Sequence, residues 1–211
     1  NIYKEPSLYY FGGEQADGNA SMNDVLGRKG ANLAEMTLLG LPVPPGFTIP
    51  NKLVKQYDEK TSRLPPEVEK LVIDGVKGIE DRTESVFGKL KRFGDRESPL
   101  FLSVRSGAGE SSPGEYETMT KVGLHRTTLD AYAREIGDAC QAYFDYIRYM
   151  AEYAYDVMED KKTHDSVKNI IHKASFINKY SEGGYNTLSD SASVKELKKM
   201  VDEAEATFKR K

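Results

Sequence analysis

The segment from Leu100 to Gly123 constrains this chain more than any other part of it. An apolar run typical of a strand, Leu100–Val104, leads directly into Arg105. The loop that follows is rich in small residues: Ser106, Gly107, Ala108, Gly109, Ser111, Ser112, Pro113 and Gly114. Such a loop can cradle phosphate oxygens because glycines leave backbone N–H groups accessible, and an arginine adds a fork of donors that matches phosphate. Taken alone, the segment also fits an ordinary strand and turn with a surface arginine.

A second segment, residues 25–49, carries another candidate anion site. Gly27, Lys29 and Gly30 lead into a run with apolar residues at helical spacing, and Gly40 stands where a glycine would cap the C-terminus of that helix. A lysine in a glycine-flanked turn at a helix start can reach an anion beside free N–H groups. The spacing is not that of a Walker A loop. A solvated lysine at a helix entry is the alternative.

Together these segments resemble the pyruvate phosphate dikinase family, in particular its N-terminal nucleotide-binding domain. The matching stretches are FGGEQADGNASMNDVLGRKGANLAEMTLLGLPVPPGFTI (residues 11–49) and PLFLSVRSGAGESSPGEYETMTKVGL (residues 99–124). The likeness continues more weakly near residues 64–72 and 193–209. The resemblance therefore spans most of the chain, with two dense islands.

The resemblance implies an α+β, ATP-grasp-like lobe that binds ATP with magnesium and passes phosphate to a histidine on a separate domain. By position, Lys29 matches the family's phosphate-binding lysine and Arg105 its phosphate-binding arginine. The glycine-rich loop of the family falls on Ser106, Gly107, Ala108, Ser111, Pro113, Gly114 and Thr118. These residues form the predicted nucleotide site.

The chain also departs from the family. Gly109 stands where the family has a basic residue, Ser112 where it has a methionine, and residues 115–117 (Glu-Tyr-Glu) where it has Met-Met-Asp. Carboxylates at Glu115 and Glu117 would repel ATP phosphates unless a metal intervened. The 211 residues do not include the family's second ATP-grasp lobe, phosphohistidine domain or pyruvate-binding barrel. We therefore assign no catalytic and no metal-binding residue, and whether the chain is an enzyme stays open.

Composition narrows the classes of protein to which the chain can belong. With 38% hydrophobic residues in 211, the chain can bury a core, and its net charge of −3 gives no basic field for nucleic acid. Because no apolar stretch approaches the ~20 residues of a membrane span, we expect no membrane partner. The single cysteine, Cys140, excludes an intramolecular disulfide and suits a buried thiol in a reducing compartment, so we expect a cytoplasmic protein.

The patterns divide the chain into an α/β nucleotide-binding-like subdomain, residues 1–124, and a mainly helical second subdomain, residues 125–211. The strands expected within them lie over 8–11, 47–49 and 100–104. The expected helices lie over 31–39, over 52–59 with Asn51 as the cap, from Pro65–Pro66 onward, over 129–158, and over 194–208 with Ser193 and Glu196 as a capping box.

The helix from Tyr143 to Tyr155 is unusually rich in tyrosine, which favours a protein contact; ordinary packing is the alternative. Two functions therefore remain. The chain is either a non-catalytic, dikinase-like nucleotide-binding domain kept as a structural or interaction module of a larger assembly, for example a cytoskeletal one, or a working ATP-binding lobe of a phosphotransferase (ATP to histidine to pyruvate) completed by other segments.

Overall fold

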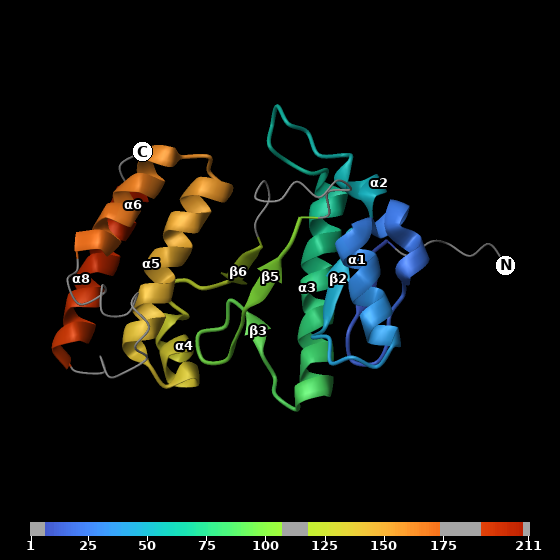
Figure 1. Ribbon diagram of the computed structural model, residues 1–211, viewed down its shortest axis with the longest axis horizontal. Coiled ribbons are helices and arrows are strands. Elements are labelled where there is room, and N and C mark those ends of the chain that lie inside the picture. The colour runs from blue at the N-terminus through green and yellow to red at the C-terminus, as the bar shows by residue number, and fades with distance from the viewer. Residues whose placement is uncertain (1–6, 107–117, 174–190, 209–211) are drawn as a thin grey trace. The chain divides into compact units, whose positions relative to one another are not determined.

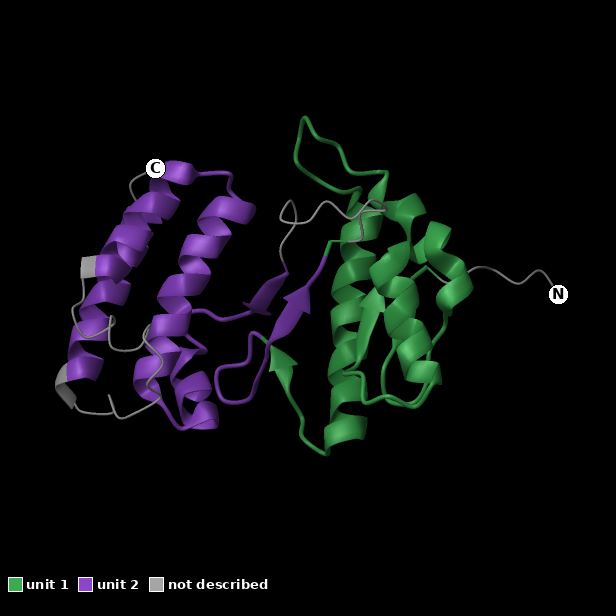
Figure 2. Cartoon of the chain, viewed as in Figure 1, with its two compact units in different colours: residues 1–93, 106–115 green, residues 94–105, 116–211 purple. Residues whose placement is uncertain are grey.

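The computed structural model describes residues 7–106, 118–173 and 191–208 (Figure 1). Helices and short antiparallel strands combine in them, so the predicted α+β class is confirmed. The described residues form two compact units (Figure 2): unit 1 holds 7–93 and Ser106, and unit 2 holds 94–105, 118–173 and 191–208. The division at residue 124 that the sequence suggested stays a prediction about subdomains. Along the chain, the first boundary between the two units lies between Phe93 and Gly94.

Unit 1 is built around a small two-stranded sheet that contacts two helices. Strand β1 (Tyr9–Phe11) pairs antiparallel with β2 (Gly46–Thr48). The sheet contacts both α1 (Asn23–Leu38), which lies between the two strands in the sequence, and α3 (Pro66–Phe87), and in Figure 1 it lies between these helices. The shorter elements of unit 1 are η1 (Ala20–Met22), α2 (Asn51–Val54) and β3 (Arg92–Phe93).

Helix α3 packs closely on the β1–β2 sheet because two residues of the helix, both glycines, have no side chain. A Cβ at Gly75 would lie 2.6 Å from Leu8 Cδ1, and a Cβ at Gly78 would lie 2.7 Å from the Tyr10 hydroxyl. Pro66 begins the helix, as the sequence predicted, since proline at the first helical position sacrifices no hydrogen bond. The close approach buries the apolar face of α3 against the sheet.

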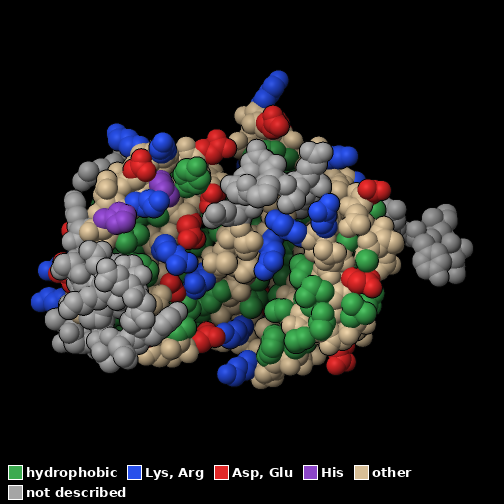
Figure 3. Space-filling view, viewed as in Figure 1, with side chains coloured by type: hydrophobic (Ala, Val, Ile, Leu, Met, Phe, Trp, Pro, Cys, Tyr) green, Lys and Arg blue, Asp and Glu red, His purple; other side chains and the backbone are tan. Residues whose placement is uncertain are grey.

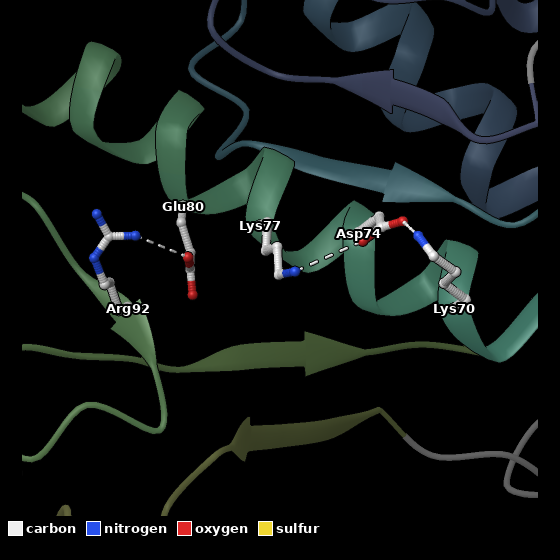
Figure 4. A network of polar contacts seen from close by, with 5 residues as sticks. All are labelled: Lys70, Asp74, Lys77, Glu80 and Arg92. Carbon is white, nitrogen blue, oxygen red and sulfur yellow. Dashed lines mark hydrogen bonds and ion pairs between the residues drawn. The ribbon is translucent and has the colours of Figure 1, made fainter.

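A line of charged residues follows α3 and ends at β3 (Figure 4). The carboxylate of Glu80 accepts the Phe93 N–H at 2.8 Å and lies 3.4 Å from Arg92 Nη1. Glu80 is buried, whereas Asp74 and its lysine partners are exposed. Exposed pairs contribute little to stability, so Glu80 is the member that holds β3 against α3.

Helix α1 is interrupted at Gly27, whose φ of 70° and ψ of 162° lie outside the helical region. Among the amino acids, almost only glycine adopts this combination. The regular part of the helix follows Gly27 and ends in a Schellman motif, in which the N–H groups of Gly40 and Leu41 donate to Thr37 O and Met36 O at 3.0 Å each. The predicted C-terminal cap at Gly40 is therefore confirmed.

The C-terminal ends of α1 and α3 leave large apolar side chains in solvent. Leu39, Leu41, Val86 and Phe87 are all exposed. Hydrophobic side chains also gather on the visible face of unit 1 in Figure 3. Part of the exposed apolar surface of unit 1 therefore lies at these two helix ends.

Unit 2 is organised by α5 (Ala139–Asp156), which contacts three other helices. They are α4 (Leu129–Ile136), α6 (Lys161–Lys173) and α8 (Ser191–Phe208). The buried apolar residues of α5 are Cys140, Ala142, Tyr143, Tyr146, Ile147, Met150, Ala151 and Ala154. The Cys140 thiol is buried, as the sequence predicted.

The strands of unit 2 precede these helices. Strand β5 (Leu102–Val104) pairs antiparallel with β6 (Met119–Val122), and β4 (Pro99–Leu100) comes before them. The prediction of one continuous strand over residues 100–104 is therefore wrong. The strand is interrupted at Phe101, whose ring packs edge-on against Tyr132 with centroids 5.3 Å apart. No helix in the described part of the chain has the length and apolar character needed to cross a bilayer.

The single helix expected over residues 129–158 is two helices. Gly137, at a φ of 72°, ends α4, and its N–H donates to Ala133 O. Asp138 then caps α5, because its side chain accepts the Gln141 N–H at 2.9 Å. A left-handed glycine followed by a capping aspartate terminates one helix and starts the next.

Two further helix predictions need correction. The helix expected over residues 52–59 ends at Val54, and Asn51 lies inside it with Pro50 as the cap. The Asp58 carboxylate accepts hydrogen bonds from the Lys60 N–H and the Thr61 hydroxyl. These bonds stabilise a turn, which competes with continuation of the helix. Helix α8 begins at Ser191, so the capping box predicted at Ser193 lies within the helix.

Replacing Ile147 with alanine should destabilise the chain by about 2–5 kcal/mol, because its side chain is fully buried and the change leaves a cavity. Chemical denaturation followed by circular dichroism measures the loss. The matched control is Ile73→Ala on α3, where the side chain is 58% exposed and a change within about 0.5 kcal/mol is expected. Equal losses in the two variants would contradict the assigned core.

Replacing Gly27 with asparagine should destabilise the chain by about 1–3 kcal/mol, because asparagine does not tolerate the backbone angles found there. The control is Gly40→Asn in the same segment, where φ is 76° and an added Cβ meets no atom within 4 Å. Asparagine is accepted at such helix ends, so its cost there should be about 1 kcal/mol or less. Denaturation midpoints of the two variants compare them directly.

Candidate functional site

The first candidate phosphate-binding group is the start of the regular part of α1. A helix that begins after a break presents N–H groups that have no partner within the helix, and the helix dipole makes that end positive. Lys29 lies in this first turn, directly after the break at Gly27, and its side chain is exposed. The structure thus places Lys29 at a helix start, as the sequence predicted.

Gly30 fixes this helix start against the sheet. A Cβ on Gly30 would lie 2.7 Å from Thr48 Cγ2 and 3.3 Å from Leu26 Cβ, so only glycine allows α1 to approach β2 so closely. Asn51 adds a polar contact, because its side-chain amide donates to Asp24 O at 2.9 Å. The backbone around Lys29 is therefore held on both sides of the break.

The second candidate group is the loop end of the β5–β6 hairpin, where the segment between the two strands leaves β5 and joins β6. Val104 pairs with Met119, so Arg105 and Thr118 leave the last registered pair on the two strands. Arg105 is exposed, whereas Ser106 and Thr118 are partly buried. The hairpin thereby presents a guanidinium at the beginning of the glycine-rich segment and a hydroxyl at its end.

Five predicted site residues lie outside the described residues: Gly107, Ala108, Ser111, Pro113 and Gly114. The departures at Gly109, Ser112 and residues 115–117 lie there as well. Lys29 belongs to unit 1 and Arg105 to unit 2. The convergence of these two side chains on one phosphate site therefore stays a prediction.

Sequence reasoning missed a polar group next to the hairpin, which we call the Asp145 cluster: Asp145, Tyr132, Gln141 and Lys121. Asp145 is only 7% exposed, and its carboxylate accepts the Tyr132 hydroxyl at 2.7 Å and Gln141 Nε2 at 2.9 Å. Lys121 Nζ from β6 lies 3.4 Å from the same carboxylate. Burial, together with the hydrogen bond to Asp145, raises the pKa of Tyr132, so its hydroxyl stays a donor.

A sequence signal for this cluster did exist. Asp145 stands between Ala142 and Tyr146 on the buried face of α5, and a charged residue is seldom buried without partners. Gln141 lies four residues before Asp145 on the same helix, so this partner was foreseeable as well. Lys121 and Tyr132 come from other elements, and their pairing with Asp145 was not foreseeable.

The tyrosines singled out in the sequence divide between core and surface. Tyr143 and Tyr146 are buried, and the Tyr146 hydroxyl lies 3.2 Å from Glu205 on α8. Burial and the nearby Glu205 carboxylate raise the pKa of Tyr146 to about 12. Tyr153 and Tyr155 are exposed at the end of α5. Tyr149 is half-buried, and its ring lies beside that of Tyr153. The most exposed tyrosines of the helix therefore lie at its C-terminal end.

The described residues offer donors for the phosphates of ATP but no set of ligands for magnesium. Lysine, arginine, hydroxyls and a helix start are suitable donors for phosphate oxygens. Among the described residues, no group of three or more His, Cys, Asp or Glu side chains is arranged to hold a metal ion. These residues thus fit a phosphate but not a resident magnesium ion, and we assign no step to the ion.

Known proteins similar to this chain place it in a family. No protein-family model matches it. The pyruvate, phosphate dikinase of Clostridium symbiosum is 38% identical over 148 residues, 70% of this chain and 16% of that protein. The protein of the same name from Rhizobium meliloti is 43% identical over 151 residues, 72% of this chain and 16% of its own length.

Pyruvate, phosphate dikinase 2 of Zea mays is 38% identical over 152 residues, which are 72% of this chain and 16% of the maize protein. The chain thus spans about 16% of the length of these relatives. The agreement extends over most of the chain in relatives from bacteria and a plant. By its sequence, the chain therefore belongs to the pyruvate phosphate dikinase family.

Proposed function

We propose that this chain binds ATP through its phosphates, as the phosphate-binding part of a dikinase-type nucleotide-binding domain. Membership of the family supports this function. The observation that carries it is the break at Gly27, which creates a helix start in unit 1 with the exposed Lys29 in its first turn. Helix starts with accessible N–H groups are common anion sites.

In this proposal the two candidate groups have different roles. Lys29 supplies a point charge beside the N–H groups of α1, whereas Arg105 supplies a planar fork that can bind two phosphate oxygens at once. Ser106 and Thr118 add hydroxyl donors where the glycine-rich segment leaves and rejoins the hairpin. Both cations are exposed, so neither needs to be released from a buried contact before it binds.

We further propose that the chain by itself binds ATP without transferring its phosphate. No residue is assigned to catalysis, and the described residues hold no metal-binding group. The family resemblance implies transfer from ATP to a histidine and then to pyruvate. In the alternative function, that transfer is completed by segments outside this chain, and the nucleotide lobe works as part of a phosphotransferase.

A second candidate function is protein binding through the exposed end of α5. It is favoured by the aromatic and apolar side chains gathered there: Tyr153, Tyr155, Val157 and Met158 are exposed. Tyrosine and methionine are enriched at protein interfaces. If copies of the chain associate through this end, sedimentation should show concentration-dependent association that Tyr155→Ser abolishes. A monomer at every concentration would exclude self-association there.

Replacing Lys29 or Arg105 with methionine should each weaken ATP binding by about 10- to 150-fold. Each change removes a charged contact worth about 1.5–3 kcal/mol, and a factor of ten corresponds to ~1.4 kcal/mol. Isothermal titration calorimetry of the 211-residue chain with ATP measures the affinity. Phosphate release in the same samples should stay at the background rate.

The controls are exposed cations outside the proposed site. Lys55→Met, in unit 1, and Arg148→Met, in unit 2, change charge and length in the same way. Their affinity for ATP should stay close to that of the wild type. If all four variants weaken binding equally, the effect is one of net charge and the assigned site is wrong.

A further inference from the structure

The position of Arg105 depends on a hairpin that is not regular. Between the pairs Leu102–Val122 and Val104–Met119, β6 contains one residue more than β5, which makes a β-bulge. Bulges bend a strand and redirect the side chains next to them. Arg105 and Thr118 lie next to the Val104–Met119 pair, on the side of the segment that connects the strands. The bulge therefore lies at the base of the segment that presents these two residues.

Lys121 adopts an unusual conformation at this bulge. Its φ is 58°, a left-handed backbone angle that is costly for residues other than glycine and asparagine. Such a conformation persists only where the surroundings determine it. The contact that accompanies it is the one between Lys121 Nζ and the Asp145 carboxylate, 3.4 Å apart.

The partner of Lys121 is held firmly. Asp145 is fixed by the Tyr132 hydroxyl at 2.7 Å and by the Gln141 amide at 2.9 Å, which come from α4 and α5. Removing one member of a buried ion pair leaves a charge without compensation, so the arrangement resists change. The helices of unit 2 thus hold β6 at the residue where it bulges.

We propose that the Asp145 cluster positions the loop end of the β5–β6 hairpin for phosphate binding. Asp145 is then a positioning residue: it sets the affinity for phosphate through Lys121 and the bulge and does not contact the ligand. This inference rests on the proposed function, because it concerns the arginine and threonine assigned there. It adds a determinant of affinity that neither the glycine-rich loop nor the lysine turn contains.

The sign of one substitution separates positioning from simple electrostatics. Asp145→Asn removes a negative charge, which by Coulomb's law alone would favour binding of an anion. The variant keeps an oxygen that can accept the Tyr132 hydroxyl but loses the attraction for Lys121. If the cluster positions the hairpin, the affinity for ATP should fall.

The test is calorimetric titration of the 211-residue chain with ATP. We expect Asp145→Asn to bind about 3- to 30-fold more weakly, the range of indirect couplings of this kind. The matched control is Glu152→Gln, which removes the same charge from the same helix at a more exposed position. The affinity of the control should be unchanged or slightly raised.

Variants of Lys121 test the same contact from the hairpin side. Lys121→Met should weaken ATP binding as Asp145→Asn does. Lys121→Arg keeps the positive charge, so its affinity for ATP should stay close to that of the wild type. The double variant Asp145→Asn/Lys121→Met should bind no more weakly than the weaker single variant, because both changes break one contact. Additive losses would overturn the inference.

The possible failures can be told apart. If the wild type does not bind ATP, or Arg105→Met binds as well as the wild type, the proposed function fails and this inference falls with it. If Arg105→Met weakens binding while a folded Asp145→Asn binds as tightly as the wild type, or more tightly, only the positioning role is wrong. Should circular dichroism show Asp145→Asn unfolded, the comparison of Lys121→Met with Lys121→Arg decides, because Lys121 is partly exposed.

Discussion

A carboxylate can be buried only where donors replace the water that it loses, and in unit 2 this requirement falls on Asp145. Its donors come from three elements: Tyr132 on α4, Gln141 on α5 and Lys121 on β6. Meeting the requirement fixes the distance between the hairpin and the helices. The rest of unit 2 packs around α5, whose Ile147 is fully buried.

Unit 1 depends on a constraint of another kind, the close approach of helices to a two-stranded sheet. Gly30 on α1 and Gly75 on α3 leave no room for a side chain, because their neighbours are Thr48 and Leu8. The break at Gly27 belongs to the same design, since it starts a new helical segment just before Gly30. The position of Lys29 at a helix start is thus a consequence of the way α1 packs against the sheet.

Local signals in the sequence predicted what depends on local chemistry. Pro66 marked the start of α3 and Gly40 the end of α1, because proline and glycine restrict the backbone whatever surrounds them. The division of residues 129–158 at Gly137 was missed, although the glycine and Asp138 are adequate signals for it. A continuous apolar pattern concealed the break, because both helices bury residues in one core.

By itself, the sequence determined the family, the α+β class and the two segments in which phosphate-binding residues are expected, since each rests on residue types at fixed spacing. Only the tertiary structure decided the left-handed Lys121, the bulge in β6 and the pairing of Asp145 with Lys121 and Tyr132. The physical reason is that a buried charge constrains residues far apart in the chain. The residues that satisfy it are chosen by the packing of α4, α5 and β6, which no local pattern specifies.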